Sequence, residues 1–222
     1  MFTVEQRDAL RDRVLAMARE ERRVVAGAAV GSLALGGGDR YSDLDLTFGV
    51  ADGVPVLDVL DDWTRRFDEA VRLIDLERDA TVYRVFLFPD ILQLDLSMTP
   101  AAEFRPAGPR FRLLFGEAAA GEVPAASAPA AADIFGWGVI YALHARSCIE
   151  RGRLWQAEHY IGAVRDHALT LACIREGRPA TQARGYDDLS AAALERLGGT
   201  HVGGLERGAL SAALAASVTA LI

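Results

Sequence analysis

The chain has 222 residues, of which 51% are hydrophobic and 25% charged, so it can bury a full core in one large domain or two small ones. This composition argues against disorder as its main state. The formal net charge is -7, there is no lysine, and the arginines are scattered, which argues against duplex nucleic acid as a partner because a phosphate backbone requires a concentrated basic face. A cationic small molecule, or a nucleotide whose charge is masked by a metal ion, fits this balance better.

The N-terminus and the cysteines indicate the compartment. The first 23 residues are amphipathic and carry charges of both signs, which is the pattern of neither a secretory signal nor a membrane span. Cys148 and Cys173 lie in amphipathic stretches without metal-ligand spacing nearby, so we expect reduced core residues. We therefore expect a cytoplasmic protein without membrane contacts.

The first half of the chain alternates helix-like and strand-like patterns. Apolar residues near helical spacing, with Thr3 as N-cap and Gln6 three residues later, predict a first helix that ends near Arg23. A second predicted helix begins at Pro55 and covers residues 55–70. Only Pro89 and Asp90 separate the last two strand-like runs, which should therefore form an antiparallel hairpin. The predicted strands are 24–30, 43–50, 71–77, 81–88 and 91–98.

The second half is helical. Between Gly116 and Ala132, small residues and prolines replace large apolar side chains, which is typical of a linker. Beyond it, the spacing predicts helices, with Gly152 and Gly177 as breaks. These helices are 133–151, 154–176, about 190–197 and 206–221. We therefore predict an α+β domain over 1–116, a linker over 117–132 and an all-α helical bundle over 133–222.

Two aspartates stand in the second strand-like run, where its pattern favours burial. On a strand, Asp43 and Asp45 project to the same face. Paired carboxylates resist burial unless they share a cation, and Mg²⁺ takes such oxygen ligands together with substrate phosphates. Asp95 has the same apolar flanks and lies in a run that could lie beside residues 43–50. Three such groups could hold two ions for an in-line phosphoryl displacement.

The glycine-rich turn before Asp43 could supply an anion site. Gly31 and Ser32 offer backbone N–H groups and a hydroxyl at the end of a strand, where a nest of amides can hold an anion. Because glycine has no Cβ, a phosphate can come close.

Together these residues resemble a known signature. Gly31-Ser32, a spacer containing Gly36, the run Ser42-Asp43-Leu44-Asp45-Leu46 and the later Asp95 are similar to the motif of the nucleotidyltransferase superfamily, which includes DNA polymerase β and the antibiotic nucleotidyltransferases. The motif covers residues 24–98. The resemblance implies a nucleotidyltransferase-type mixed β-sheet flanked by helices and followed by a helical bundle, as in the kanamycin, aminoglycoside and lincosamide enzymes.

The resemblance also implies roles for single residues. Asp43 and Asp45 would bind Mg²⁺, and Asp95 would be a third ligand and could take the proton of an acceptor hydroxyl. Gly31 and Ser32 would contact the nucleoside triphosphate, and Arg40 and Ser42 are further candidates for binding it. Relatives often place an arginine just after the Gly-Ser pair, whereas this chain has Leu33-Ala34-Leu35. Arg40 is the candidate substitute for that phosphate-binding cation.

Three other features have two interpretations each. Glu158 is a candidate catalytic residue, because some related two-domain enzymes use a helical glutamate; the alternative is a surface salt bridge. In "ARGYDDLS" (183–190), Asp187 or Asp188 could cap a helix or contact a cationic acceptor. Asp75 imitates the motif without a glycine turn before it, which favours the solvated face of a strand.

These observations predict a Mg²⁺-dependent transferase that moves a nucleoside monophosphate, AMP from ATP or from another nucleoside triphosphate, onto a hydroxyl of a small molecule. The resemblance suggests aminoglycoside-like or lincosamide-like antibiotics as acceptors. A protein-modifying or antitoxin-type minimal nucleotidyltransferase and a non-catalytic nucleotide-binding module are the alternatives. A homodimer is compatible with the sequence.

Overall fold

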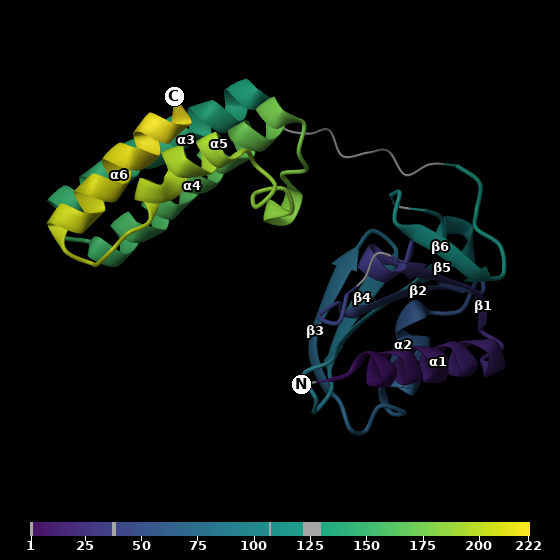
Figure 1. Ribbon diagram of the computed structural model, residues 1–222. Coiled ribbons are helices and arrows are strands. Elements are labelled where there is room, and N and C mark those ends of the chain that lie inside the picture. Colours follow the sequence, from purple (N-terminus) through teal and green to yellow (C-terminus); the bar gives the residue numbers. More distant parts are fainter. Residues whose placement is uncertain (1, 37–38, 107, 122–129) are drawn as a thin grey trace. The chain divides into compact units, whose positions relative to one another are not determined.

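The computed structural model describes residues 2–36, 39–106, 108–121 and 130–222, which form two compact units, Met1–Ala125 and Ala126–Ile222 (Figure 1). Half of the predicted linker, 117–132, lies outside the described residues, since 122–129 are not among them.

The first unit is built on a mixed sheet with the strand order β3-β4-β5-β2-β1-β6. Strands β2 and β5 are parallel, and the other neighbours are antiparallel. The strands are β1 (Val24–Val30), β2 (Leu44–Val50), β3 (Val71–Arg78), β4 (Thr81–Leu87), β5 (Gln93–Pro100) and β6 (Phe111–Phe115). The helices are α1 (Val4–Glu20) and α2 (Val56–Thr64), with the 3-10 turns η1 (Gly31–Leu33) and η2 (Ala101–Glu103).

Helices α1 and α2 cover one face of this sheet (Figure 1). The residues of β2 and β5 that face these helices are apolar and fully buried, among them Leu46, Phe48 and Leu96. The ring of Phe48 packs edge-on against Trp63 of α2, with 5.3 Å between the ring centroids. Since side chains alternate along a strand, the polar residues of β2 and β5 are directed to the opposite face. The α+β class with a mixed sheet and flanking helices is confirmed.

Most predicted elements of this unit are present. Thr3 caps α1 in a capping box, because its side chain accepts from the N–H of Gln6 and the Gln6 side chain accepts from the N–H of Thr3. The predicted hairpin of β4 and β5 is confirmed, and its turn places Ile91 at a φ of 65°. The prediction that α2 runs to residue 70 is wrong. It ends at Thr64, where the chain turns so that Phe67 packs edge-on against Phe86 in the core.

Strand β6 was not predicted. It pairs with β1 and forms one edge of the sheet, while β3 forms the other edge. Its sequence, "FRLLF", is only partly buried. The sequence therefore lacks the alternation of apolar and polar residues that distinguishes the buried face of a strand from its solvated face.

The second unit is helical, as predicted. Its helices are α3 (Ala131–Glu150), α4 (Leu154–Glu176), α5 (Ala191–Leu197) and α6 (Arg207–Leu221), with the 3-10 turns η3 (Thr181–Ala183) and η4 (Gly198–Thr200). Helices α3, α4 and α6 pack against one another. Both breaks are confirmed, because Gly152 and Gly177 have φ values of 70° and 66°. Cys148 and Cys173 are free and buried. Within the described residues, no helix combines the length and apolar character that a bilayer span requires.

Candidate metal centre

The register of the sheet brings the predicted aspartates together. Asp45 and Asp95 are direct partners in the parallel pairing of β2 and β5. Asp43 immediately precedes β2 and, two residues before Asp45, projects to the same side of the chain. This is the face that α1 and α2 leave uncovered.

The three carboxylates form a compact cluster. Asp43, Asp45 and Asp95 are half-buried, and each offers one carboxylate oxygen such that these oxygens all lie within 4.8 Å of one another. Three anions at this separation repel one another, and a bound cation would offset that repulsion. The ligand type is that of a hard divalent ion such as Mg²⁺, which is bound by oxygen.

Gly31 lies directly against this cluster. A Cβ at this position would be 2.1 Å from Oδ2 of Asp45, and the φ of Gly31 is 68°. Both facts require glycine here, because a side chain would displace the carboxylate and strain the backbone. The glycine of the predicted motif therefore makes room for Asp45.

Ser32 follows in the turn η1. Its hydroxyl is buried and has no hydrogen-bond partner among the described residues. A buried polar atom without a partner costs stability, so this hydroxyl is available to a ligand. The orphan hydroxyl fits the predicted phosphate-binding role of Ser32, whereas the space beside Gly31 is occupied by the Asp45 carboxylate.

Asp95 has its own supporting residue, Gln93, which the sequence analysis missed. Burial raises the pKa of Asp95, the hydrogen bond from Gln93 lowers it, and the Asp43 carboxylate raises it further. Gln93 Nε2 donates to Oδ1 of Asp95 at 2.7 Å. The sequence does indicate this contact, because Gln93 and Asp95 are two residues apart and such residues share a face of a strand.

Arg7 of α1 is a second residue that the sequence analysis missed. It is buried at 5% exposure, and its Nη1 donates to the backbone carbonyls of Asp39 (2.6 Å) and Ser42 (3.2 Å). These bonds fix the end of the loop that leads into Asp43. The helical spacing indicates that Arg7 is buried, since it lies three residues before buried Leu10 and therefore on the apolar side of the helix.

The loop uses two of the predicted nucleotide-binding residues internally. The hydroxyl of Ser42 accepts from the N–H of Asp39 at 3.0 Å and donates to its carboxylate at 3.2 Å. Arg40 is exposed, lies over the ring of Tyr41 at 4.4 Å and donates to its hydroxyl at 2.5 Å. Their contacts with a nucleotide stay predictions.

The apolar run after Ser32 has a structural explanation. Ala34 is fully buried, Leu33 packs against the core beneath the sheet, and Leu35 is 68% exposed. A charged side chain at Ala34 would have to enter the core.

Asp75 is not merely a solvated strand residue. It accepts two hydrogen bonds, of 2.8 and 2.7 Å, from the buried guanidinium of Arg84, which also donates to Asp61 and Thr64 of α2. This hydrogen bonding holds the pKa of Asp75 below its usual range. The network joins α2, β3 and β4 on the helix-covered face, away from the aspartate cluster.

The candidates of the second unit lie elsewhere. Glu158 is half-buried on α4, and its carboxylate forms no hydrogen bond or ion pair within the part of the chain that the structure describes. Its catalytic role stays a prediction. The helix-capping interpretation of Asp187 and Asp188 is wrong, because α5 begins after Ser190, whose hydroxyl accepts from the N–H of Ala193.

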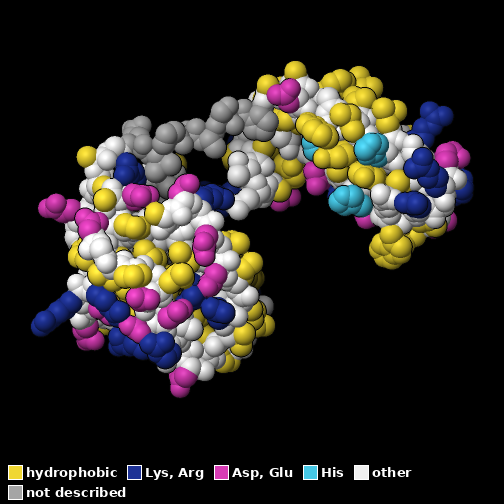
Figure 2. Space-filling model, turned by 180° about the vertical axis from the view of Figure 1, so that it is seen from behind, with side chains coloured by type: hydrophobic (Ala, Val, Ile, Leu, Met, Phe, Trp, Pro, Cys, Tyr) yellow, Lys and Arg dark blue, Asp and Glu magenta, His cyan; other side chains and the backbone are white. Residues whose placement is uncertain are grey.

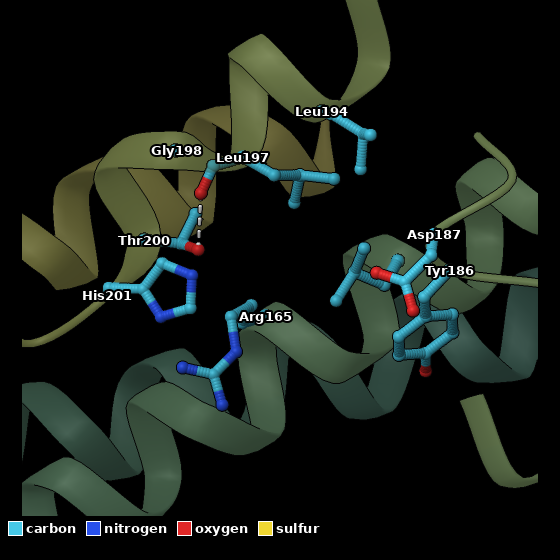
Figure 3. A pocket seen from close by; sticks show the side chains of 9 residues that line it. Arg165, Tyr186, Asp187, Leu194, Leu197, Gly198, Thr200 and His201 are labelled. Atoms are coloured by element: carbon cyan, nitrogen blue, oxygen red, sulfur yellow. Dashed lines mark hydrogen bonds between the residues drawn. The ribbon is translucent and has the colours of Figure 1, made fainter. Parts of the chain in front are cut away.

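Asp187 instead helps to line a hollow of about 250 Å³ (Figure 3). Arg165 and His201 lie on one side of this hollow, and Asp187 and Tyr186 on the other. Arg165 pairs weakly with Asp166, at 3.6 Å. A contact between Asp187 and a cationic acceptor stays a prediction.

Comparisons with known proteins add little. No protein-family model matches the sequence, and no curated protein sequence matches it. Among solved structures, the chain is similar to an aminoglycoside 6-adenyltransferase from Bacillus subtilis, with 15% identity and a TM-score of 0.39 over 100% of this chain and 88% of that one. A likeness this distant carries no functional argument, so the chemistry is argued from the site.

Proposed function

We propose that this chain is a Mg²⁺-dependent nucleotidyltransferase that transfers a nucleoside monophosphate, AMP from ATP, to a hydroxyl of a small-molecule acceptor. The observation that carries the proposal is the convergence of Asp43, Asp45 and Asp95 beside Gly31. The resemblance of the motif in residues 24–98 to nucleotidyltransferases supports the same reaction class.

Asp43, Asp45 and Asp95 would hold Mg²⁺, which would supply positive charge that neutralises the phosphate groups of the nucleotide. The N–H groups and hydroxyl of the Gly31-Ser32 turn would bind the triphosphate. The acceptor oxygen attacks the α-phosphorus, the bond to pyrophosphate breaks, and the acceptor proton passes to a carboxylate. Asp95 is the candidate base through Oδ2, since Gln93 already donates to Oδ1. Positioning and charge neutralisation account for most of the acceleration in such transfers.

The acceptor class rests on the resemblance and on charge. The related enzymes act on aminoglycoside-like or lincosamide-like antibiotics, which are cationic. A net charge of -7 favours the approach of such molecules.

A transfer assay tests the proposal. The full chain is incubated with α-labelled nucleoside triphosphates, Mg²⁺ and a panel of hydroxyl-bearing acceptors, and labelled products are separated. We expect Asp43→Asn to lower kcat roughly a thousand-fold, because one charged ligand of the reacting centre is lost. The matched control, Asp52→Asn, removes a carboxylate from the exposed turn after β2 and should retain full activity.

Other outcomes decide between the alternatives. Label found on a co-purifying protein would replace the small-molecule acceptor with a protein acceptor. If the wild type binds nucleotide but forms no more product than the Asp43→Asn variant, the transferase proposal is overturned in favour of a binding module.

A further inference from the structure

Helix α3 exposes an unusual amount of apolar surface. Its exposed large side chains are Phe135 (41%), Trp137 (53%), Val139 (39%), Ile140 (39%) and Leu143 (58%). In Figure 2, hydrophobic side chains gather over the surface of the second unit. Single exposed apolar residues are normal, but a contiguous group on one helix indicates an interaction surface.

Part of this surface is a regular stripe. Gly136, Ile140, Leu143 and Ser147 follow one another at spacings of four, three and four residues, which places them along one side of the helix. A Cβ added to Gly136 would meet nothing within 4 Å, so another backbone can approach closely at that end. At the other end, Leu143 and Ser147 help to line a shallow hollow of about 340 Å³. The stripe therefore has small residues at its ends and large ones in its middle.

We infer that this stripe pairs antiparallel with the same stripe of a second copy of the chain. A two-fold axis beside Tyr141 and Ala142 would place Gly136 opposite the partner's Ser147, and Ile140 opposite the partner's Leu143. Small residues then meet small ones at both ends, and the two large apolar pairs meet in the middle. The arrangement is isologous, so the surface is complementary to itself and closes as a dimer.

Charge favours the same pairing. Asp133 and Arg151 are eighteen residues apart, which is five turns at about 3.6 residues per turn, so both flank the stripe on the same side. Neither side chain forms an ion pair with the described residues of its own protomer. Their midpoint coincides to within half a residue with that of the apolar pairs. The two-fold axis is perpendicular to the plane that contains the two antiparallel helices, so a residue on one side of this plane stays on the same side in the partner. Asp133 therefore faces the partner's Arg151, and this contact occurs twice in the dimer.

Sedimentation equilibrium of the full chain tests this interface. We expect a monomer–dimer equilibrium that Leu143→Glu weakens roughly a hundred-fold, because a charge would replace a central apolar contact. The matched control is Leu57→Glu on α2, which has a similar exposure of 42% and lies in the other unit. It should dimerise as the wild type does. Circular dichroism checks that each variant is folded.

A charge exchange tests the antiparallel register. Asp133→Arg and Arg151→Asp should each weaken dimerisation, roughly ten-fold, because like charges then face each other. The double variant should restore the affinity, since the pairs are re-formed with exchanged partners. A wild-type chain that stays monomeric overturns the proposal. An equal effect of Leu57→Glu, or a double variant no better than the singles, overturns it as well.

Discussion

At the scale of single residues, the site depends on two residues that carry no charge. Gly31 leaves room for the Asp45 carboxylate, and Gln93 orients Asp95 from its own strand. Neither residue is itself a ligand of the proposed metal ion. Each positions a carboxylate that is one, and residues that position ligands in this way control metal affinity.

We predict that Gly31→Ala abolishes high-affinity binding of Mn²⁺, used as a probe for Mg²⁺, because the added Cβ would lie 2.1 Å from the Asp45 carboxylate. Gly53→Ala is the matched control. Its φ of 80° is similar, but a Cβ there meets nothing within 4 Å. Both variants should lose about 1 kcal/mol of unfolding free energy from the left-handed backbone. Calorimetric titration should show lost Mn²⁺ binding in the Gly31 variant alone; equal Mn²⁺ affinities in both variants would contradict the account.

We predict that Gln93→Leu weakens Mn²⁺ binding roughly ten-fold, the lower end of the effect of removing a group that supports a ligand. The Asp95 carboxylate would lose the 2.7 Å hydrogen bond from Gln93. This hydrogen bond lowers the pKa of Asp95, so its loss would also favour the protonated carboxyl group, which binds metal poorly. A matched change at exposed Gln156 of α4, Gln156→Leu, should leave Mn²⁺ affinity unchanged. Unchanged affinity in the Gln93 variant would show that this glutamine does not support the site.

At the scale of elements, more of the candidate site than of the strand order could be predicted from the sequence. Alternation along a strand predicts that Asp43 and Asp45 share a face, and the proline-containing turn predicts the hairpin that carries Asp95. The parallel contact of β2 with β5 was left open, because strand order depends on contacts between distant segments. Strand β6, Arg7 and the network of Arg84 with Asp75 were not predicted, since each depends on a partner remote in sequence.

The junction between α1 and β1 predicts a dependence on pH. The side chain of Glu21 accepts from the guanidinium and backbone N–H of Arg23, and Arg23 also pairs with Asp62 of α2, at 2.7 Å. Hydrogen bonding from the Arg23 side chain lowers the pKa of Glu21 to about 2 from an ordinary 4.5. A lowered pKa means that this stabilisation is fully present above pH 4.5 and is lost as the pH falls toward 2.

We therefore predict that Glu21→Gln flattens the acid limb of the stability curve of the first unit. Urea unfolding at several pH values, in a Trp137→Phe/Trp155→Phe background, would follow this unit through buried Trp63. The wild type should lose more unfolding free energy than the variant between pH 4.5 and 2. Parallel curves would show that the Glu21–Arg23 contact contributes nothing.

At the scale of the whole molecule, the two proposals rest on different units. The aspartate cluster belongs to the first unit and the α3 stripe to the second. We expect the effects of changes in the two units to add. We predict that Leu143→Glu leaves Mn²⁺ affinity unchanged and that Asp43→Asn leaves the dimerisation constant unchanged. Titration calorimetry and sedimentation of both variants check this, and a cross-effect would show that metal binding and dimerisation are linked.

The central claim is that Asp43, Asp45 and Asp95 share a divalent metal ion with a nucleotide. Anomalous diffraction from a crystal grown with Mn²⁺ and a non-hydrolysable ATP analogue tests it most directly. The account predicts at least one anomalous peak in contact with oxygens of all three carboxylates, with the triphosphate against the Gly31-Ser32 turn. A bound nucleotide whose metal lies elsewhere, or Asp95 turned away from Asp43 and Asp45, would contradict it.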